Sequence, residues 1–372
     1  MGNNMTGKII SIILFITICF VLLNGCQNEK PLLTDGNLFV SLAAFDTTGL
    51  YDATDSTRLT PVPGAKVTLD SKEYEKRYQF ETDSNGIAVM NDLLASAYEI
   101  FVEYPISAGT VLLSSMTKEI FESSSTPDSM FMHNIAMSPL VINEIYSCGP
   151  ENNVFYFFDQ YVELYNRSDE IQYLDAMIIT RARTAVEIEP FIETWDYVEN
   201  TYAFQFPGTP GGKEYPVYPG QFVVIASDAY DHSSSIPGAI NLENADWECV
   251  NQLSSDFDNP DVPNLSNINP SRTTDYLINL RSDAIVLAEG SNYWQNGDYV
   301  AIHISTILDG VEYKSSSSTS KRLTRRLDSG YTGIGVSNYS GMSRERITPG
   351  KDTNNSTLDF EVIDAATPGY NH

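Results

Sequence analysis

The chain has 372 residues, and its 49 Asp and Glu against 22 Lys and Arg give a net charge of −27. Such a surface repels the phosphates of nucleic acids, whose binding relies on clustered Lys and Arg, so we expect no nucleic-acid partner. It also repels an anionic bilayer surface, so attachment to a membrane would need an anchor other than charge.

The N-terminal residues predict an export signal. Residues 9–23 (IISIILFITICFVLL) form an apolar run like the hydrophobic segment of a secretory signal, and a spanning helix needs about 20 apolar residues. The run leads into Leu-Asn-Gly-Cys, which resembles a bacterial lipobox and makes Cys26 the lipidated residue. The resemblance implies a signal peptide at 1–25, a tether at 26–36 and an outer-membrane lipoprotein of the cell envelope, periplasmic or surface-exposed. There are two alternatives: an ordinary signal with an accidental cysteine, and a permanent membrane helix.

After the tether, short alternating stretches rich in Val, Ile, Tyr and Phe recur between Gly, Pro, Asn, Asp and Ser. This pattern is typical of sandwiches and barrels, and long helical periodicity is nearly absent. At roughly 100–200 residues per domain, the length indicates two or three domains. We predict an all-β protein of two β-sandwich domains, at 37–138 and 139–372. Pro139 marks the boundary because proline keeps the preceding residue extended.

The first predicted domain begins with a strand at 38–42. Further strands are expected at 65–69, 78–82, 87–89 and 97–102. The residues Asp83-Ser84-Asn85-Gly86 predict a tight turn, because Asn-Gly favours positive φ. This order resembles the transthyretin-like sandwich of carboxypeptidase regulatory-like domains, an accessory or spacer module that carries no catalytic residues. The matching positions are Pro61, Gly64, Ala65, Val67, Leu69, Thr82, Asp83, Gly86, Leu93 and Tyr98.

Three acids, Glu144, Asp159 and Glu163, lie in or beside two short predicted strands, VINEIY and DQYVELYN. Paired carboxylates can serve a glycosidase, whereas structural carboxylates inside a sandwich must accept hydrogen bonds from neighbouring groups. Because alternate strand residues share a face, Glu144 is expected beside Ile142, and Glu163 opposite Leu164. The chain has no HExxH and no GxSxG motif. We expect these acids to specify the fold and the protein not to be an enzyme, and a hydrolase is the alternative.

The same two strands resemble the opening of a lamin-tail-like domain, an immunoglobulin-type sandwich. Later matches to that domain follow in order at 218–226, 283–287, 344–346, 352–355, 359–360 and 367–371. Together, the lipobox, the transthyretin-like domain and the expanded lamin-tail-like domain resemble an uncharacterised lipoprotein family of Bacteroidetes. The resemblance implies a non-enzymatic binding or accessory module whose partner is an outer-membrane receptor of the TonB-dependent kind. Fold alone does not establish function.

The second domain is longer than the roughly 100 residues that such a sandwich needs, and its surplus lies in two insertions, at about 183–215 and 229–275. Loops of this length are usually functional or disordered. The aromatic and proline content of the second insertion, which includes Trp247, predicts a packed, lid-like loop. We expect this loop to contact the ligand or partner.

The second insertion also contains an incomplete calcium motif at Asp256, Asp258 and Asp261. Calcium loops follow a D-x-D-x-D-G pattern with a later bidentate glutamate. Here Pro260 occupies the fifth position and Asp261 stands where the glycine belongs. We therefore expect no cofactor and no resident metal, and calcium binding is an alternative function.

The aromatic residues suggest a second alternative, glycan binding, because Trp and Tyr side chains combine an apolar ring with a polar group. The candidates are Trp195, Trp247 and Trp294, with Tyr293 beside the last. In strands, such rings more often pack against neighbouring strands or the core.

Two cysteines, Cys148 and Cys249, remain outside the N-terminal segment. An export compartment permits disulfides, so these two residues form a candidate disulfide. Free, partly buried thiols are the alternative, because bonding requires the two Cα atoms to lie within about 7 Å.

Overall fold

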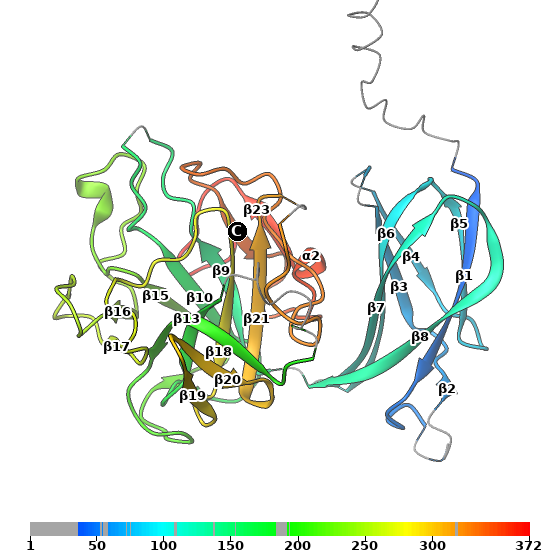
Figure 1. Ribbon diagram of the computed structural model, residues 1–372, viewed down its shortest axis with the longest axis horizontal. Coiled ribbons are helices and arrows are strands. Elements are labelled where there is room, and N and C mark those ends of the chain that lie inside the picture. Colours follow the sequence, from blue (N-terminus) through cyan, green and yellow to red (C-terminus); the bar gives the residue numbers. More distant parts are fainter. Residues whose placement is uncertain are drawn as a thin grey trace, which may run out of the picture. The chain divides into compact units, whose positions relative to one another are not determined.

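The computed structural model describes residues 36–372 except 53, 55–58, 72, 75, 108–109, 137, 153, 184–191, 193 and 317–318. The predicted signal peptide, Cys26 and nearly all of the tether lie outside the described residues. The chain divides into two compact units, Met1–Tyr104 with Leu113–His133, and Pro105–Leu112 with Asn134–His372. Each unit is built on one curled sheet that forms a half-barrel (Figure 1). The predicted all-β class with two sandwich-like domains is confirmed.

The sheet of the first unit has the strand order β2-β1-β8-β7-β6-β3-β4, and β5 also pairs with β1. Its strands are β1 (Leu38–Asp46), β2 (Thr60–Pro61), β3 (Lys66–Ser71), β4 (Arg77–Glu81), β5 (Ile87–Leu93), β6 (Ser96–Ser107), β7 (Thr110–Ile120) and β8 (Ser124–Ala136). Ala65, Val67 and Leu69 are fully buried, as the alternation predicts. Gly86 has a φ of +73° and donates to the Asp83 carbonyl at 2.9 Å, so the expected tight turn joins β4 to β5.

The sheet of the second unit has the order β21-β18-β12-β13-β17-β16-β15-β10-β9-β22-β23, with β20 paired to β13 and β19 paired to β20. Its strands are β9 (Leu140–Tyr146), β10 (Tyr161–Asn166), β12 (Ile178–Ala182), β13 (Tyr197–Gln205), β15 (Phe222–Ala226), β16 (Trp247–Val250), β17 (Asn264–Asn267), β18 (Ser282–Ala288), β19 (Tyr293–Asn296), β20 (Tyr299–His303), β21 (Ile307–Lys314), β22 (Ser343–Arg346) and β23 (Phe360–Ile363). A separate pair joins β11 (Gln172–Tyr173) to β14 (Pro216–Val217).

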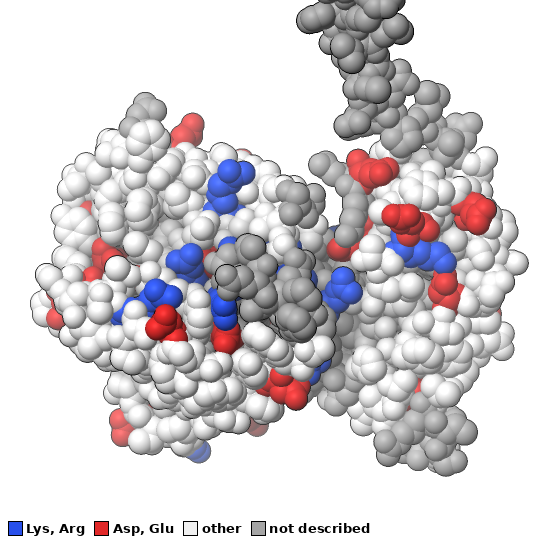
Figure 2. Space-filling view, viewed as in Figure 1, with Lys and Arg blue, Asp and Glu red and all other residues white. Residues whose placement is uncertain are grey.

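Helices are few and short in the described residues: α2 (Ser356–Asp359) and the 3₁₀ turns η2 (His232–Ser234) and η3 (Ile304–Thr306). None of them is long and apolar enough to cross a bilayer. On the face of the molecule seen in Figure 2, acidic and basic residues are interspersed. The net negative charge is therefore not gathered into one patch on that face.

The core of the second unit lies inside the curl of its sheet. Val162 and Leu164 of β10 belong to this core, so Glu163 points to the opposite side, as predicted. On that side Tyr161 stacks on Tyr146 with ring centroids 5.8 Å apart. The strand is therefore buried on both faces.

The prediction that Glu144 shares a face with Ile142 is wrong. Glu144 lies opposite Glu163, whereas the next pair in register is Leu164 with Ile142, so a β-bulge interrupts β9. A bulge places an extra residue on one strand and breaks the alternation of faces. As a result, Ile142 joins the core while Glu144 turns away from it.

The curl brings the two ends of the sheet together. The Asp309 carboxylate on β21 accepts a hydrogen bond from the Ile142 amide of β9 at 2.7 Å. It also lies 2.8 Å from Nη2 of Arg346 on β22. All three residues are fully or almost fully buried. An internal ion pair thus joins strands from opposite ends of the strand order.

Candidate functional site

The insertion predicted at 229–275 is not a single lid-like loop. Two of its segments, β16 and β17, pair in parallel with each other and lie inside the large sheet between β15 and β13. The first insertion likewise contains β13, while residues 184–191 and 193 lie outside the described part of the chain. The surplus length therefore enlarges the sheet and leaves shorter loops around β16 and β17.

Three carboxylates from different loops meet beside these strands. One oxygen each of Asp228, Asp256 and Asp275 lies within 4.8 Å of the others, and all three residues are half-buried. Asp228 follows β15, whereas the other two come from the loops after β16 and β17. We call these three residues the acid cluster.

Two oxygens of the acid cluster lack a hydrogen-bond partner. Oδ1 of Asp228 and Oδ1 of Asp275 are buried, and no group in the described part of the chain donates to them. Asp256, by contrast, accepts from the amide of Asn251 at 2.6 Å and from that of Phe257 at 3.0 Å. Buried oxygens without partners are costly, so this arrangement calls for a donor or a cation that the chain does not supply.

The pKa values of the acid cluster also reflect the lack of groups that would stabilise its ionised carboxylates. Burial, followed by the charges of Asp275 and Asp256, raises the pKa of Asp228 to about 8. Burial and the Asp256 charge raise the pKa of Asp275 to about 7, and burial also raises the pKa of Asp256. In the absence of a cation, Asp228 and Asp275 therefore bind protons near neutral pH. A divalent cation would favour the ionised forms and lower all three pKa values.

A continuous series of rings lies next to the acid cluster. Successive ring centroids are 4.9–5.6 Å apart along Phe257, Tyr230, His232, Tyr156, Phe158 and Phe157. His232 is buried at the middle of the series and contacts the Tyr156 hydroxyl through Nδ1 and the Asp228 carbonyl through Nε2. Tyr230 and Phe257 are exposed by 40% and 41%. The rings therefore present an apolar surface to solvent beside the carboxylates.

Of the three acids predicted in the loop, only Asp256 joins the cluster. Asp258 accepts from the side-chain amide of Asn264 at 2.9 Å, and both Asp258 and Asp261 are exposed. The sequence motif fails because the partners of Asp256 come from positions 228 and 275, distant along the chain. No local spacing signals such a set.

The structure also places the tryptophan and the two cysteines that the sequence singles out. Trp247 is only 7% exposed and packs edge-on against Phe206 and Tyr215, so its ring is mainly a core side chain. Cys148 and Cys249 are both buried free thiols that belong to different core clusters, so the candidate disulfide does not form.

The remaining two tryptophans of the glycan alternative lie close together. Trp195 stacks on Tyr197 with centroids 5.0 Å apart, and Tyr197 meets the Trp294 ring edge-to-face at 5.3 Å. Trp294 and Tyr293 are 39% and 38% exposed on β19. β20 pairs with β13 on one side and with β19 on the other. This pairing, which the sequence does not reveal, brings the rings of the two outer strands together.

Two of the predicted strand acids, Glu144 and Glu163, form a second buried group together with Glu345 of β22. Glu144 lies directly opposite Glu163 on one side and Glu345 on the other. All three accept backbone amides from residues 367–372: Thr367 donates to Glu144, Gly369 to Glu163 at 2.6 Å and His372 to Glu345 at 3.1 Å. Their oxygens are thus occupied in holding the segment 367–372 onto the sheet.

The remaining strand acid, Asp159, is also fully buried. One of its oxygens accepts from the Tyr146 hydroxyl and the Ile240 amide, both at 3.3 Å. Burial raises its pKa to about 6. Hydrogen bonds of this kind are those expected for acids that specify a fold.

The C-terminal part of this chain matches a known protein family. Residues 218–296 and 286–367 match the model of a family described as "Protein of unknown function (DUF4876)". The match spans less than half of the chain. No curated protein matches it.

A solved structure of a DUF4876 family protein from Bacteroides thetaiotaomicron is similar over most of both chains. It is 22% identical, with a TM-score of 0.52, and the alignment covers 87% of this chain and 94% of that one. At this identity the likeness shows a shared fold alone. The family match and this structure support a link to a family of unknown function; the transthyretin-like and lamin-tail-like names remain expectations.

Other solved structures align at lower similarity. A candidate carbohydrate-binding protein from Pseudomonas aeruginosa is 12% identical over 28% of this chain and 93% of that one, with a TM-score of 0.19. The major pilin SpaD of Corynebacterium diphtheriae has the same identity and TM-score over 39% and 43%. Scores this low carry no argument about function.

Proposed function

We propose that this chain is a non-enzymatic binding protein of the DUF4876 family, held in the cell envelope by lipid on Cys26. Its ligand face is the acid cluster together with the exposed rings of Tyr230 and Phe257. The observation that carries this proposal is the pair of buried, unpartnered oxygens on Asp228 and Asp275. Clustered acids alone are common on an acidic protein, but orphaned buried oxygens that meet a third carboxylate favour a bound cation.

Calcium is the cation that fits this set. Hard divalent cations take oxygen ligands, and calcium tolerates irregular geometry with six to eight oxygens at about 2.3–2.6 Å. The three carboxylates supply the charge, and water and partner groups complete the shell. A cation held there would let a hydroxyl- or carbonyl-bearing ligand bind beside the rings of Tyr230 and Phe257.

We expect calcium to bind the protein and to raise its thermal stability. After treatment with EDTA, titration calorimetry should show one calcium site, and a concentration of 100 times Kd should add about 2.7 kcal/mol to the free energy of unfolding. Asp228→Asn and Asp256→Asn should each weaken binding at least about tenfold. Asp258→Asn, a change in the same loop outside the cluster, should bind calcium normally. Absence of heat with the unaltered protein, or equal losses in all three variants, would contradict the site.

The lipid anchor and an outer-membrane receptor partner complete the proposal, supported by the lipobox-like sequence before Cys26. Cys26→Ser should move the protein from the membrane fraction to the soluble fraction, because the lipid is lost while the folded units are unchanged. Crosslinking of native membranes followed by affinity purification should recover a receptor with the unaltered protein. Recovery of the protein alone would reject the receptor, and membrane retention of Cys26→Ser would reject the anchor.

A further inference from the structure

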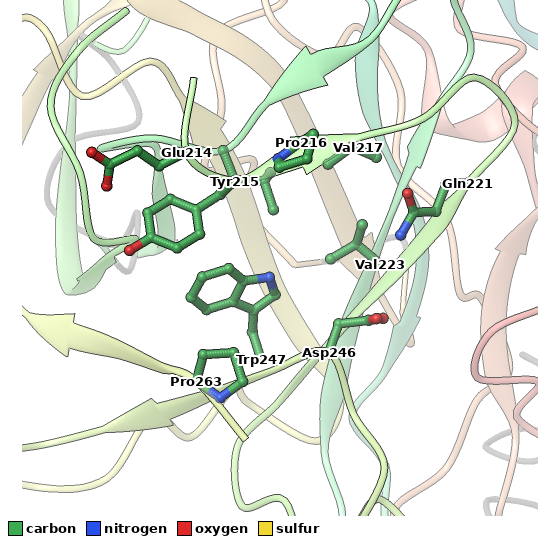
Figure 3. Close-up of a pocket in the computed structure, with 10 residues that line it drawn as sticks. Glu214, Tyr215, Pro216, Val217, Gln221, Val223, Asp246, Trp247 and Pro263 are labelled. Atoms are coloured by element: carbon green, nitrogen blue, oxygen red, sulfur yellow. The ribbon is translucent and has the colours of Figure 1, made fainter. Parts of the chain in front are cut away.

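A cavity of about 220 Å³ lies at the edge of the core, beside the Trp247 ring of β16 (Figure 3). Trp247, Tyr215, Pro216 and Pro263 form its apolar walls. Ligand pockets for drug-sized molecules occupy roughly 300–1,000 Å³, so this cavity suits a smaller group.

The aromatic wall is fixed in position before any ligand arrives. The Trp247 ring meets Phe206 at 5.0 Å and Tyr215 at 5.3 Å, both edge-to-face. The backbone amides of Glu214 and Tyr215 donate to the Asp175 carboxylate at 3.0 Å each, which anchors the segment that carries the Tyr215 ring. Little side-chain freedom would therefore be lost on binding, which favours affinity.

Polar groups stand at the rim of the same cavity. Gln221 accepts the Tyr218 amide through Oε1 at 2.9 Å, and Figure 3 shows its amide nitrogen turned toward Val223 and the cavity. Asp246, another lining residue, accepts the Val224 amide through Oδ2 at 2.8 Å, which fixes its carboxylate in position. The cavity thus offers apolar rings, one amide donor and, among its lining residues, one carboxylate.

We propose that this cavity binds a single pyranose ring of a neutral glycan. A pyranose has an apolar C–H face that packs on aromatic rings and hydroxyls that donate to a carboxylate and accept from an amide. The Asp246 carboxylate, which belongs to the cavity lining, repels anionic sugars, because like charges are unfavourable in a partly desolvated site. The site is distinct from the acid cluster and needs no cation.

The test uses a Trp195→Phe, Trp294→Phe protein, in which Trp247 is the single tryptophan. The probes are the methyl pyranosides of glucose, galactose, mannose and N-acetylglucosamine, titrated in EDTA, with methyl glucuronide as the anionic comparison. At least one neutral glycoside should change the Trp247 emission with a Kd on the order of 1 mM, while the glucuronide binds at least about tenfold more weakly.

Variants of the lining residues test whether the glycoside binds in this cavity. Gln221→Ala should weaken it about tenfold, and Asp246→Asn, which keeps the acceptor for the Val224 amide, should reduce the discrimination against the glucuronide. Tyr218→Ala is the matched control, since its exposed ring lies outside the cavity lining, and it should bind normally. The proposal is overturned if no neutral glycoside changes the emission, or if Gln221→Ala and Asp246→Asn both behave as the unaltered pocket does. Failure here leaves the calcium result unaffected, because calcium is chelated throughout.

Discussion

Arg346→Met is expected to lower the free energy of unfolding of the second unit by about 3–5 kcal/mol, the usual cost of leaving a buried charge without its partner. The guanidinium is 1% exposed and lies 2.8 Å from Asp309, 3.5 Å from Asp352 and 3.4 Å from Asp359. It also donates through Nε to the Ile142 carbonyl of β9 at 2.7 Å. Methionine fills a similar volume but leaves three acids facing one another where the two ends of the sheet meet.

The loss from Arg346→Met should grow as pH rises. Burial raises the pKa of Asp309 and of Asp359 to about 7, and the charge of Arg346 opposes that rise. Without the arginine, both carboxyls are driven further toward the protonated form. The variant should therefore have a lower free energy of unfolding at pH 8, where the two carboxyls must ionise, than at pH 6.

Urea denaturation followed by tryptophan fluorescence measures this effect in the second unit alone, because all three tryptophans lie there. Arg326→Met is the matched control: Arg326 is 41% exposed and pairs with an Asp196 that is 70% exposed. Exposed pairs contribute about 0–1 kcal/mol, so this control should unfold at nearly the same urea concentration as the unaltered protein. An Arg346→Met variant with an unchanged midpoint would show that the ion pairs do not stabilise the sheet closure.

Glu163→Gln is expected to stabilise the second unit at alkaline pH and to flatten its pH dependence. Burial raises the pKa of Glu163 from 4.5 to about 8; the Gly369 amide opposes the rise, and the Glu144 charge adds to it. Between these two values the folded state binds more protons than the unfolded state. The free energy of unfolding therefore falls as pH rises from about 4.5 to 8.

The size of the effect follows from the shift. At about 1.36 kcal/mol per pKa unit, the penalty of Glu163 at pH 9 has an upper limit near 5 kcal/mol, and we expect on the order of 3 after local relaxation. Glutamine removes the penalty and keeps an acceptor for the Gly369 amide. The other carboxylate oxygen of Glu163, Oε1, accepts from Nδ2 of Asn143 at 3.0 Å. In the variant an NH₂ takes that place, so the Asn143 amide must flip, which turns its Oδ1, a buried atom without a partner among the described residues, toward the new donor.

Unfolding free energies from pH 5 to pH 9 test this expectation. Glu361→Gln is the control, since Glu361 is exposed on β23 in register with Glu345. That variant should keep the slope of the unaltered protein. If Glu163→Gln keeps the slope as well, the carboxyl of Glu163 is not the group that titrates.

The strands are the best-predicted part of the molecule. Residues 38–42, 65–69 and 87–89 all lie in or overlap observed strands, and the Asn-Gly turn lies where the sequence predicts it. These features depend on alternation over a few residues and on the positive φ that glycine tolerates, both of which are local properties.

The candidate site was predicted only in part. Of the acids expected in the insertion at 229–275, Asp256 joins a carboxylate group, whereas Asp258 and Asp261 lie outside it. Its partners Asp228 and Asp275 carry no local motif, and Trp247, expected in a packed, lid-like loop, lies on β16 inside the sheet. Strand content in an insertion of Asp, Asn and Pro is hidden because short parallel strands are stabilised by their neighbours more than by their own composition.

The sequence alone determined the β architecture and the net negative charge, because each depends on composition or on short-range periodicity. The tertiary structure decided which acids meet. A bulge in β9 turned Glu144 out of the core, strand order placed it between Glu163 and Glu345, and three separate loops formed the acid cluster. Such encounters depend on pairing between segments far apart in the chain, and single-residue slips in register reverse which face a side chain occupies.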